Sequence, residues 1–183
     1  MKNKPSLIIL SGPSGSGKST TAKKLLESLE GNPAYLSLDS IKHFVKDAKS
    51  TDYFLDLARI NAVFLTENYL RGGHSVIVEK AFGCYDYVKP FINSSNDLGF
   101  KSHYFKIVAP LNILIERVER RRNYSLQEKI EVGEWPLPRG NKKTAIEIYN
   151  FFEAHAHEEG IEIDSSKNSI EEIVQIIRSQ MNS

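Results

Sequence analysis

Eight residues near the N-terminus constrain the fold of this chain more than any other segment. Residues Gly12 to Ser19 read GPSGSGKS and match the pattern G-x-x-x-x-G-K-[ST] at every position. The apolar run Leu7 to Leu10 precedes them, and a helical pattern from about Lys18 to Leu29 follows. A strand, a glycine-rich loop and a helix in this order form the setting of a phosphate-binding loop, so we expect an α/β fold. The alternative is a chance glycine-rich turn, which would not need this setting.

Each residue type in such a loop has a physical role. The glycines let the backbone curl with its N–H groups inward, which makes an anion-binding nest at a helix N-terminus. Lys18 adds a positive charge for the β- and γ-phosphates, and the Ser19 hydroxyl can ligate Mg²⁺. We therefore predict a site for ATP with Mg²⁺. The predicted nucleotide-binding residues of the loop are Gly12, Pro13, Ser14, Gly15, Ser16, Gly17, Lys18, Ser19 and Thr20.

Beyond this loop, short apolar runs alternate with helical patterns. The 183 residues contain no internal repeat and no long linker, so we expect a single domain over 1–183. The alternation predicts a three-layer α/β/α sandwich with a five-stranded parallel sheet. The predicted strands are Leu7 to Leu10, Ala34 to Leu38, His74 to Val78, Tyr104 to Val108 and Ile161 to Ile163. The predicted helices are 18–29, 40–70 in two pieces, 85–93, 110–122, 142–157 and one after Ser169, where a capping box begins.

Composition excludes several classes of protein and partner. Lys and Arg number 24 against 23 Asp and Glu, so the net charge of +1 gives no reason to expect a nucleic-acid or anionic-membrane partner. The single cysteine, Cys84, allows no intrachain disulfide. No apolar run approaches the ~18 residues that span a bilayer, and the N-terminal apolar run is too short for a signal peptide. We expect a cytoplasmic protein.

Two features of nucleotide-binding switches are missing from the sequence. A regulatory GTPase carries N-K-x-D, whose carboxylate reads the guanine edge, and a D-x-x-G switch. Residues Asn141 to Thr144 read NKKT and lack that carboxylate, and no D-x-x-G occurs. Mechanical ATPases of the larger kind need a longer chain. The size and the strand spacing therefore favour a small-molecule kinase.

Several segments together resemble a known family. They are Ser37 to Lys42 after the second predicted strand, Ser75 to Glu79 as the third strand, Pro110 to Arg121, and Ile163 to Ser166. With the glycine loop, they resemble the small P-loop kinases typified by chloramphenicol phosphotransferase and the zeta-toxin-like kinases. The resemblance spans most of the chain and implies a P-loop kinase fold with a mobile lid. It departs from the family where Glu79 replaces a common Asp. Residues 80–83 read KAFG, unlike the G-[FY]-P-R of adenylate-kinase-like enzymes or the triple glycine of shikimate kinases.

Two acidic residues follow predicted strands and are candidates for the chemistry. Asp39 is our candidate general base, because strand ends face the ligand in parallel α/β sheets and the resembling phosphotransferases use an Asp here as the base. Alternatively, Asp39 only caps a helix that starts at Ser40. Glu79 is a candidate Mg²⁺ ligand with Ser19, although it could equally bind the substrate. Asp164, at the end of the last predicted strand, is expected to organise a loop near the adenine.

Four arginines crowd the end of the predicted helix 110–122. Arg117 and Arg121 are four residues apart and so share one helix face, and the resemblance places such a pair over ATP. We predict both as catalytic and nucleotide-binding residues, beside the catalytic Lys18 and Asp39. Arg120 and Arg122 are interpreted as solvent-exposed. The expected lid covers 117–140, with a loop from Asn123 to Gly140, and an acceptor-binding helical region covers about 40–71.

The sequence thus predicts an enzyme, an ATP-dependent phosphotransferase that acts on a hydroxyl of a metabolite, a nucleoside derivative or an antibiotic. Its partner is a small-molecule acceptor, and its oligomeric state is left open. Two alternatives remain. One is a nucleoside monophosphate kinase, whose acceptor is a phosphate that needs no base. The other is a nucleotide-sensing module that binds ATP without efficient catalysis. Six side chains are available to line the acceptor site: Phe44, Tyr53, Phe54, Arg59, Phe82 and Tyr85.

Overall fold

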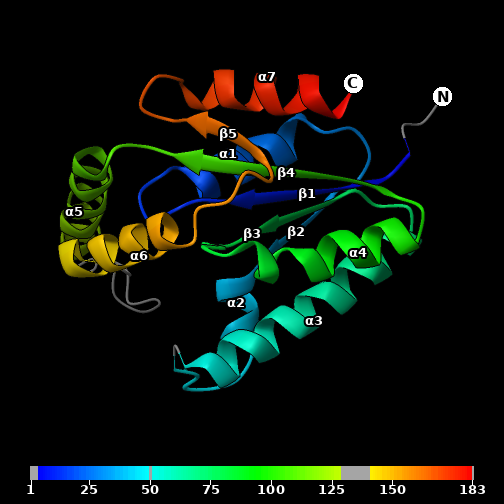
Figure 1. The fold of residues 1–183 in the computed structure, drawn as a ribbon, viewed down its shortest axis with the longest axis horizontal. Coiled ribbons are helices and arrows are strands. Elements are labelled where there is room, and N and C mark those ends of the chain that lie inside the picture. Colours follow the sequence, from blue (N-terminus) through cyan, green and yellow to red (C-terminus); the bar gives the residue numbers. More distant parts are fainter. Residues whose placement is uncertain (1–3, 50, 129–140, 183) are drawn as a thin grey trace.

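The computed structural model describes residues 4–49, 51–128 and 141–182, with the backbone alone at 124–128. These residues form one parallel sheet with helices on both faces (Figure 1). The predicted five-stranded parallel sheet is confirmed. The strands are β1 (Ser6–Ser11), β2 (Ala34–Ser37), β3 (Val76–Glu79), β4 (Lys101–Val108) and β5 (Ile161–Asp164).

The strands lie in the order β2-β3-β1-β4-β5, and every neighbouring pair is parallel. All five C-terminal ends therefore lie along the same edge of the sheet. The register aligns Glu79 at the end of β3 with both Ser37 of β2 and Leu10 of β1. The glycine loop after β1 and the residues that follow β2 and β3 consequently meet at this edge.

Helices cover the sheet on its two faces and extend past its C-terminal edge (Figure 1). They are α1 (Lys18–Ser28), α2 (Leu38–Lys42), α3 (Asp52–Arg71), α4 (Lys89–Asp97), α5 (Leu111–Glu128), α6 (Lys142–Ala154) and α7 (Ile170–Met181), with a short 3₁₀ helix η1 (Tyr85–Tyr87) before α4.

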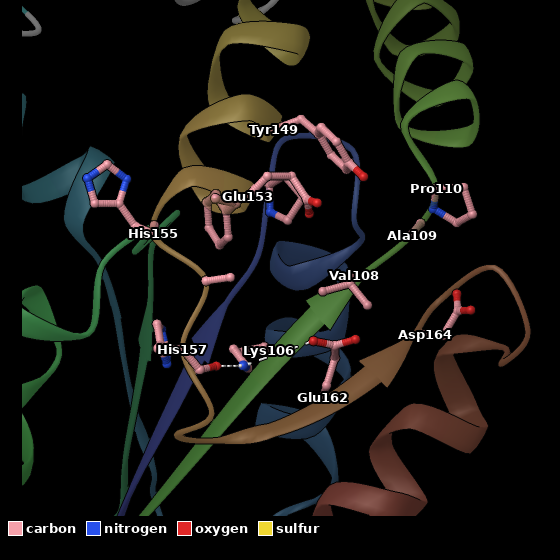
Figure 2. A pocket seen from close by; sticks show the side chains of 14 residues that line it. Lys106, Val108, Ala109, Pro110, Tyr149, Glu153, His155, His157, Glu162 and Asp164 are labelled. Carbon is pink, nitrogen blue, oxygen red and sulfur yellow. Dashed lines mark hydrogen bonds and ion pairs between the residues drawn. The ribbon is translucent and has the colours of Figure 1, made fainter.

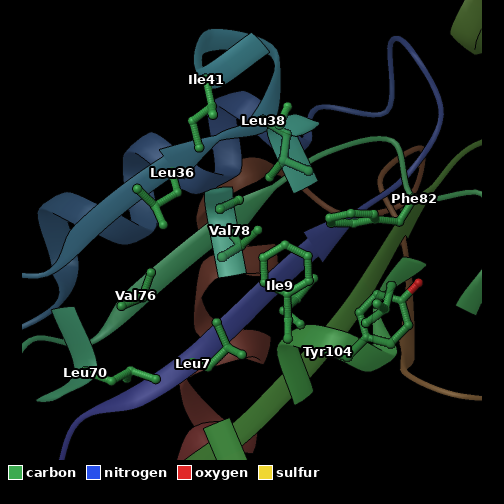
Figure 3. Packing of buried hydrophobic residues seen from close by; sticks show 14 residues of the cluster. Leu7, Ile9, Leu36, Leu38, Ile41, Leu70, Val76, Val78, Phe82 and Tyr104 are labelled. Atoms are coloured by element: carbon green, nitrogen blue, oxygen red, sulfur yellow. The ribbon is translucent and has the colours of Figure 1, made fainter. Parts of the chain in front are cut away.

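Strand β1 lies at the centre of the sheet and is buried at each of its positions. Because successive side chains of a strand point to opposite faces, Leu7 and Ile9 enter the core under α3 and α4, whereas Ile8 and Leu10 enter the core under α1 and α7. Figure 3 shows the first of these cores, where Leu7 and Ile9 lie among side chains from β2, β3 and β4. The predicted three-layer sandwich is confirmed.

Two details of the helix pattern also agree with the sequence. In α3, Ala58 and Ala62 lie one turn apart and are buried against the sheet, which agrees with the helix predicted within 40–70. At the start of α7, the Ser169 hydroxyl accepts a hydrogen bond from the Glu172 N–H, and the Glu172 carboxylate accepts one from the Ser169 N–H. The predicted capping box is therefore present.

The prediction was wrong at the end of β2. We expected the strand to run to Leu38 and the helix to begin at Ser40, with Asp39 as its possible cap. Instead, Ser37 is the extended N-cap residue, α2 begins at Leu38, and Asp39 lies in the first helical turn. A carboxylate in this position stabilises the helix through the dipole, but it does not cap the helix.

The helix before the expected lid is longer than predicted. α5 continues to Glu128, so residues 123–128 are helical rather than part of a loop, and the rest of the expected lid, 129–140, lies outside the described residues. The predicted helix 85–93 is instead the turn η1 followed by α4. Among the residues that the structure describes, no helix is long and apolar enough to cross a membrane.

Candidate active site

The glycine loop wraps tightly between the end of β1 and the start of α1. Gly15 and Gly17 have φ angles of 86° and 94°, in the left-handed region that favours glycine. A Cβ atom on Gly12 would lie 2.1 Å from the Ile107 carbonyl oxygen, and one on Gly15 would lie 2.7 Å from that of Leu114. These close approaches to β4 and α5 explain why both positions are glycine. The loop thus has the curled backbone that an anion-binding nest requires.

Lys18 is the first residue of α1, and its side chain turns back over the loop. Its Nζ donates a hydrogen bond to the Pro13 carbonyl oxygen at 3.4 Å and lies 3.7 Å from Oε1 of Glu79. Only 13% of the side chain is exposed, and burial lowers the pKa of Lys18, although Glu79 and Asp39 act in the opposite direction. The ammonium group is therefore held over the glycine loop, beside the Glu79 carboxylate.

The carboxylate of Glu79 joins the glycine loop to the neighbouring strands. It accepts hydrogen bonds from the Ser19 hydroxyl at 3.1 Å and from the Tyr35 hydroxyl at 3.2 Å, and the residue is only 5% exposed. Burial and the charge of Glu79 raise the pKa of Tyr35, so this phenol remains a donor. Tyr35 was not predicted, because an aromatic residue in a β-strand usually belongs to the core.

The pair Ser19 and Glu79 fits a magnesium site of the kind found beside nucleotide phosphates. Such a site needs one or two protein oxygens and completes its coordination with phosphate and water. Ser19 Oγ and Glu79 Oε1 lie 3.1 Å apart, and both face the loop that carries Lys18. Within the described residues, no group of three or more His, Cys, Asp and Glu side chains could hold a metal by itself. The arrangement therefore suits a metal ion that arrives with a nucleotide.

Asp39 forms a close ion pair that the sequence did not suggest. Lys80, directly after β3, donates a hydrogen bond from its Nζ to Oδ1 of Asp39 at 2.5 Å. Burial would raise the pKa of Asp39, but the charge and hydrogen bond of Lys80, with smaller contributions from Lys42 and Lys18, outweigh it and hold the pKa below its ordinary value. Asp39 is therefore an anion near Lys18.

The two predicted lid arginines differ in their surroundings. Arg117 donates a hydrogen bond to the Gly15 carbonyl at 3.4 Å. It donates two more to Ser165, one to the hydroxyl at 2.9 Å and one to the carbonyl at 2.8 Å. It thereby ties α5 to both the glycine loop and the turn after β5. Arg121 is exposed on the same helix face, and its charge lowers the pKa of Lys18. Arg120 is also exposed.

The turn after β5 is organised by its own side chains. Oδ1 of Asp164 accepts hydrogen bonds from the Ser166 N–H at 2.8 Å and the Ser166 hydroxyl at 2.6 Å. Asp164 thus shapes the turn that Arg117 contacts, and its expected place near the adenine stays a prediction. The contact of Arg117 with Ser165 was not predicted, since serines in turns carry no distinctive sequence signal.

In the part of the chain that the structure describes, cavities open at two places near the C-terminal edge of the sheet. The first, about 310 Å³, opens between α6 and the strands β4 and β5, next to Pro13 of the loop (Figure 2). Within it, Lys106 donates to the His157 carbonyl at 2.6 Å, while Tyr149 and Glu153 extend from α6. The second, about 360 Å³, lies between α2 and α3 within the predicted acceptor region.

Of the six side chains predicted for the acceptor site, two line the second cavity, Phe44 and Phe54. Phe82 is 2% exposed and packs edge to face on Phe91, so it belongs to the core instead. Tyr85 stacks on Tyr104 with ring centres 6.3 Å apart. Tyr53 is exposed, and Arg59 is paired with Asp56. Lys42, which was not predicted, lines this cavity and also acts on Asp39.

Comparisons with known proteins agree with this architecture. The family model described as AAA domain (AAA_33) matches residues 7–136. APS kinase of Mycobacterium tuberculosis, solved in complex with AMPPNP and APS, superimposes with a TM-score of 0.70 at 18% identity, covering 98% of this chain and 99% of that one. The sequence matches no curated protein.

Two further solved structures share the fold. The Deinococcus radiodurans tunicamycin resistance protein gives a TM-score of 0.61 at 20% identity, covering 97% of this chain and 95% of its own. A sugar kinase from Janibacter sp. HTCC2649 also gives 0.61, at 15% identity and with the same coverage. The resemblance to small P-loop kinases is therefore confirmed at the level of fold. The family model covers most of the chain, and the fold is the one that small P-loop kinases share. The chain therefore belongs to the AAA domain (AAA_33) family.

Proposed function

We propose that this protein is an ATP-dependent phosphotransferase that moves the γ-phosphate of ATP to a hydroxyl group of a small molecule, with Asp39 as the general base. One observation carries the proposal: two neighbouring residues join the Asp39 carboxylate to the phosphate-loop lysine, because Lys80 is hydrogen-bonded to Asp39 at 2.5 Å and the preceding residue, Glu79, lies 3.7 Å from Lys18. Asp39 and Lys18 each shift the pKa of the other, although they come from different elements of the sheet edge. A base and a phosphate-binding cation are the two groups that a hydroxyl kinase needs together.

In this proposal, different residues of the chain bind the phosphates, hold the metal and accept the proton. The N–H groups of the glycine loop and Lys18 hold the phosphates, and Arg117 and Arg121 add positive charge from α5. Ser19 and Glu79 would hold Mg²⁺, which when bound neutralises charge on the phosphates. Asp39 accepts the proton of the attacking hydroxyl, whose own pKa lies far above neutrality.

The cavity between α2 and α3 is our candidate for the acceptor site. Apart from Lys42 and Asn61, its nine lining residues are apolar. Lys42, which lines the cavity, lies one turn after Asp39 on α2 and acts on its carboxylate, so this lysine connects the cavity with the proposed base. Phe44 is 79% exposed, and a large exposed aromatic side chain beside an apolar cavity is typical of a binding site. Such a lining favours an acceptor with an apolar body rather than a polyol.

A nucleoside monophosphate kinase is the second candidate. It is favoured by the positive charge around Asp39, where Lys18, Lys42 and Lys80 all act on the carboxylate. Three ammonium groups at one site would suit an acceptor that carries its own phosphate. In that reaction the acceptor is already ionised, and no base is required.

A screen for ADP release separates these candidates. Purified protein with ATP and Mg²⁺ is offered 2-phenylethanol and cyclohexylmethanol, then glycerol and glucose, and then AMP and UMP. We expect the two alcohols with apolar bodies to stimulate ADP release most, and the phosphate ester to be detected by ³¹P NMR. Stimulation by AMP or UMP alone would favour the monophosphate kinase. A slow basal rate with every compound would favour a nucleotide sensor.

A further inference from the structure

Lys80 makes the closest polar contact of the proposed base, and nothing in the glycine-loop motif requires it. The residue follows β3 immediately, and its backbone is pinned on both sides. Its N–H donates to the Leu10 carbonyl at 3.2 Å, and its carbonyl accepts from the Phe82 N–H at 3.0 Å. Phe82 is itself tied to Ser11, whose hydroxyl donates to the Phe82 carbonyl at 2.9 Å and accepts from its N–H at 3.1 Å. The Lys80 side chain therefore extends from a fixed point at the sheet edge.

Asp39, in contrast, lies on a helix that has little stability of its own. α2 has only five residues, from Leu38 to Lys42, and no side chain caps its N-terminus. A helix of this length has little stability of its own, so its position depends on contacts with the rest of the protein. The buried side chains of Leu38 and Ile41 hold one side of α2. The Lys80–Asp39 ion pair, at 2.5 Å, holds the side that carries the carboxylate.

We propose that Lys80 is a positioning residue for the phosphotransfer reaction: from its place directly after β3 it holds the Asp39 carboxylate in position. This inference rests on the proposed function of Asp39 as the base. Lys80 binds Oδ1 of Asp39, and an ionised carboxylate has further lone pairs that can accept from a hydroxyl donor. The ion pair also connects β3, where Glu79 lies, to α2, where the candidate acceptor cavity begins.

The charges around Asp39 determine the expected effect of removing Lys80. Lys80 acts from the end of β3, Lys42 from α2 itself and Lys18 from the start of α1, while the neutral Tyr35 of β2 is also near. Burial raises the pKa of Asp39, whereas the three cations lower it, and Lys80 has the largest effect of the three. Removing Lys80 therefore raises the pKa of Asp39. A group with a lowered pKa keeps its ionised form to more acidic pH. Without Lys80, that form is lost at a higher pH.

The test compares Lys80→Met, which removes the charge, with Lys80→Arg, which keeps it. The first readout is the titration of the Asp39 carboxyl by ¹³C NMR, where the Asp39 resonance is identified as the one that Asp39→Asn loses. The second readout is the pH profile of kcat/KM with the alcohol that the screen finds most active. We expect Lys80→Met to move both the titration and the acid limb of the profile to higher pH, and to lower kcat at least ~10-fold with little change in ATP affinity. Lys80→Arg keeps the charge and should therefore retain most of the wild-type kcat and nearly the wild-type titration of Asp39.

Lys89→Met is the matched control, because Lys89 also forms an ion pair, with Asp86 at 2.8 Å, but an exposed one away from Asp39. It should leave the titration and the profile unchanged. If Lys80→Met leaves the titration of Asp39 and the acid limb where they are in the wild type, the inference is overturned. The NMR readout needs no turnover, so it tests Lys80 even if the protein proves not to be a hydroxyl kinase.

Discussion

Gly15 offers the sharpest test of the loop geometry, through the substitution Gly15→Ala. The residue has a φ of 86°, and an added Cβ would lie 2.7 Å from the Leu114 carbonyl oxygen of α5. An alanine in the left-handed region costs about 1–2 kcal/mol. The close contact involves backbone, which has to shift, and overpacking of this kind adds about 1–3 kcal/mol. We therefore expect a loss of about 2–5 kcal/mol in the free energy of unfolding.

Gly31→Ala is the matched control for this substitution. Gly31 has a similar φ of 81°, but an added Cβ would have no atom within 4 Å. It should cost only the backbone strain, about 1–2 kcal/mol. For a chain of this size, each kcal/mol lowers Tm by about 2–4 °C, so the two variants are distinguishable by thermal unfolding.

The two variants should also differ in ATP affinity, measured by calorimetry. Gly15→Ala displaces the loop from α5 and should weaken binding strongly, whereas Gly31→Ala, in a turn before β2, should not change it. Equal losses of stability in both variants, with ATP affinity preserved in both, would refute the account of how the loop packs against α5.

Two further predictions concern the helices that flank the site. Arg117→Ala should lower both turnover and Tm, because Arg117 ties α5 to Gly15 and Ser165. Arg120 is exposed, so Arg120→Ala should change neither. Equal effects of the two variants on turnover and Tm would contradict this prediction. In the cavity between α2 and α3, Leu57→Asn should raise KM for 2-phenylethanol several-fold and leave the KM for ATP unchanged in steady-state assays. An unchanged KM for the alcohol would place the acceptor elsewhere.

Much of this architecture could be predicted from the sequence, because its signals are local. The glycine pattern predicts the loop, the apolar runs predict the strands, and Ser169 with Glu172 predicts the start of α7. Because the strands are parallel, their C-terminal ends meet at one edge, and this explains why Ser19 and Glu79 could be placed together in advance.

What could not be predicted depends on contacts between distant segments. Tyr35 looks like an ordinary strand residue and Lys80 like an ordinary lysine after a strand, and only the folded structure shows that they bind the two carboxylates of the site. The end of β2 was misplaced because Leu38 is apolar and so fits either a strand or the buried side of a short helix. Phe82 was assigned to the acceptor site by position, but its packing on Phe91 places it in the core.

The most direct test of the central claim is the turnover of Asp39→Asn, measured beside its ATP affinity. The substitution removes the charge and keeps the shape of the side chain, and far-UV circular dichroism checks that the protein is folded. If Asp39 accepts the proton of a hydroxyl, turnover with the best alcohol of the screen should fall at least ~100-fold while ATP affinity stays within a few-fold. Near-normal turnover of Asp39→Asn would contradict the assignment of Asp39 as the base.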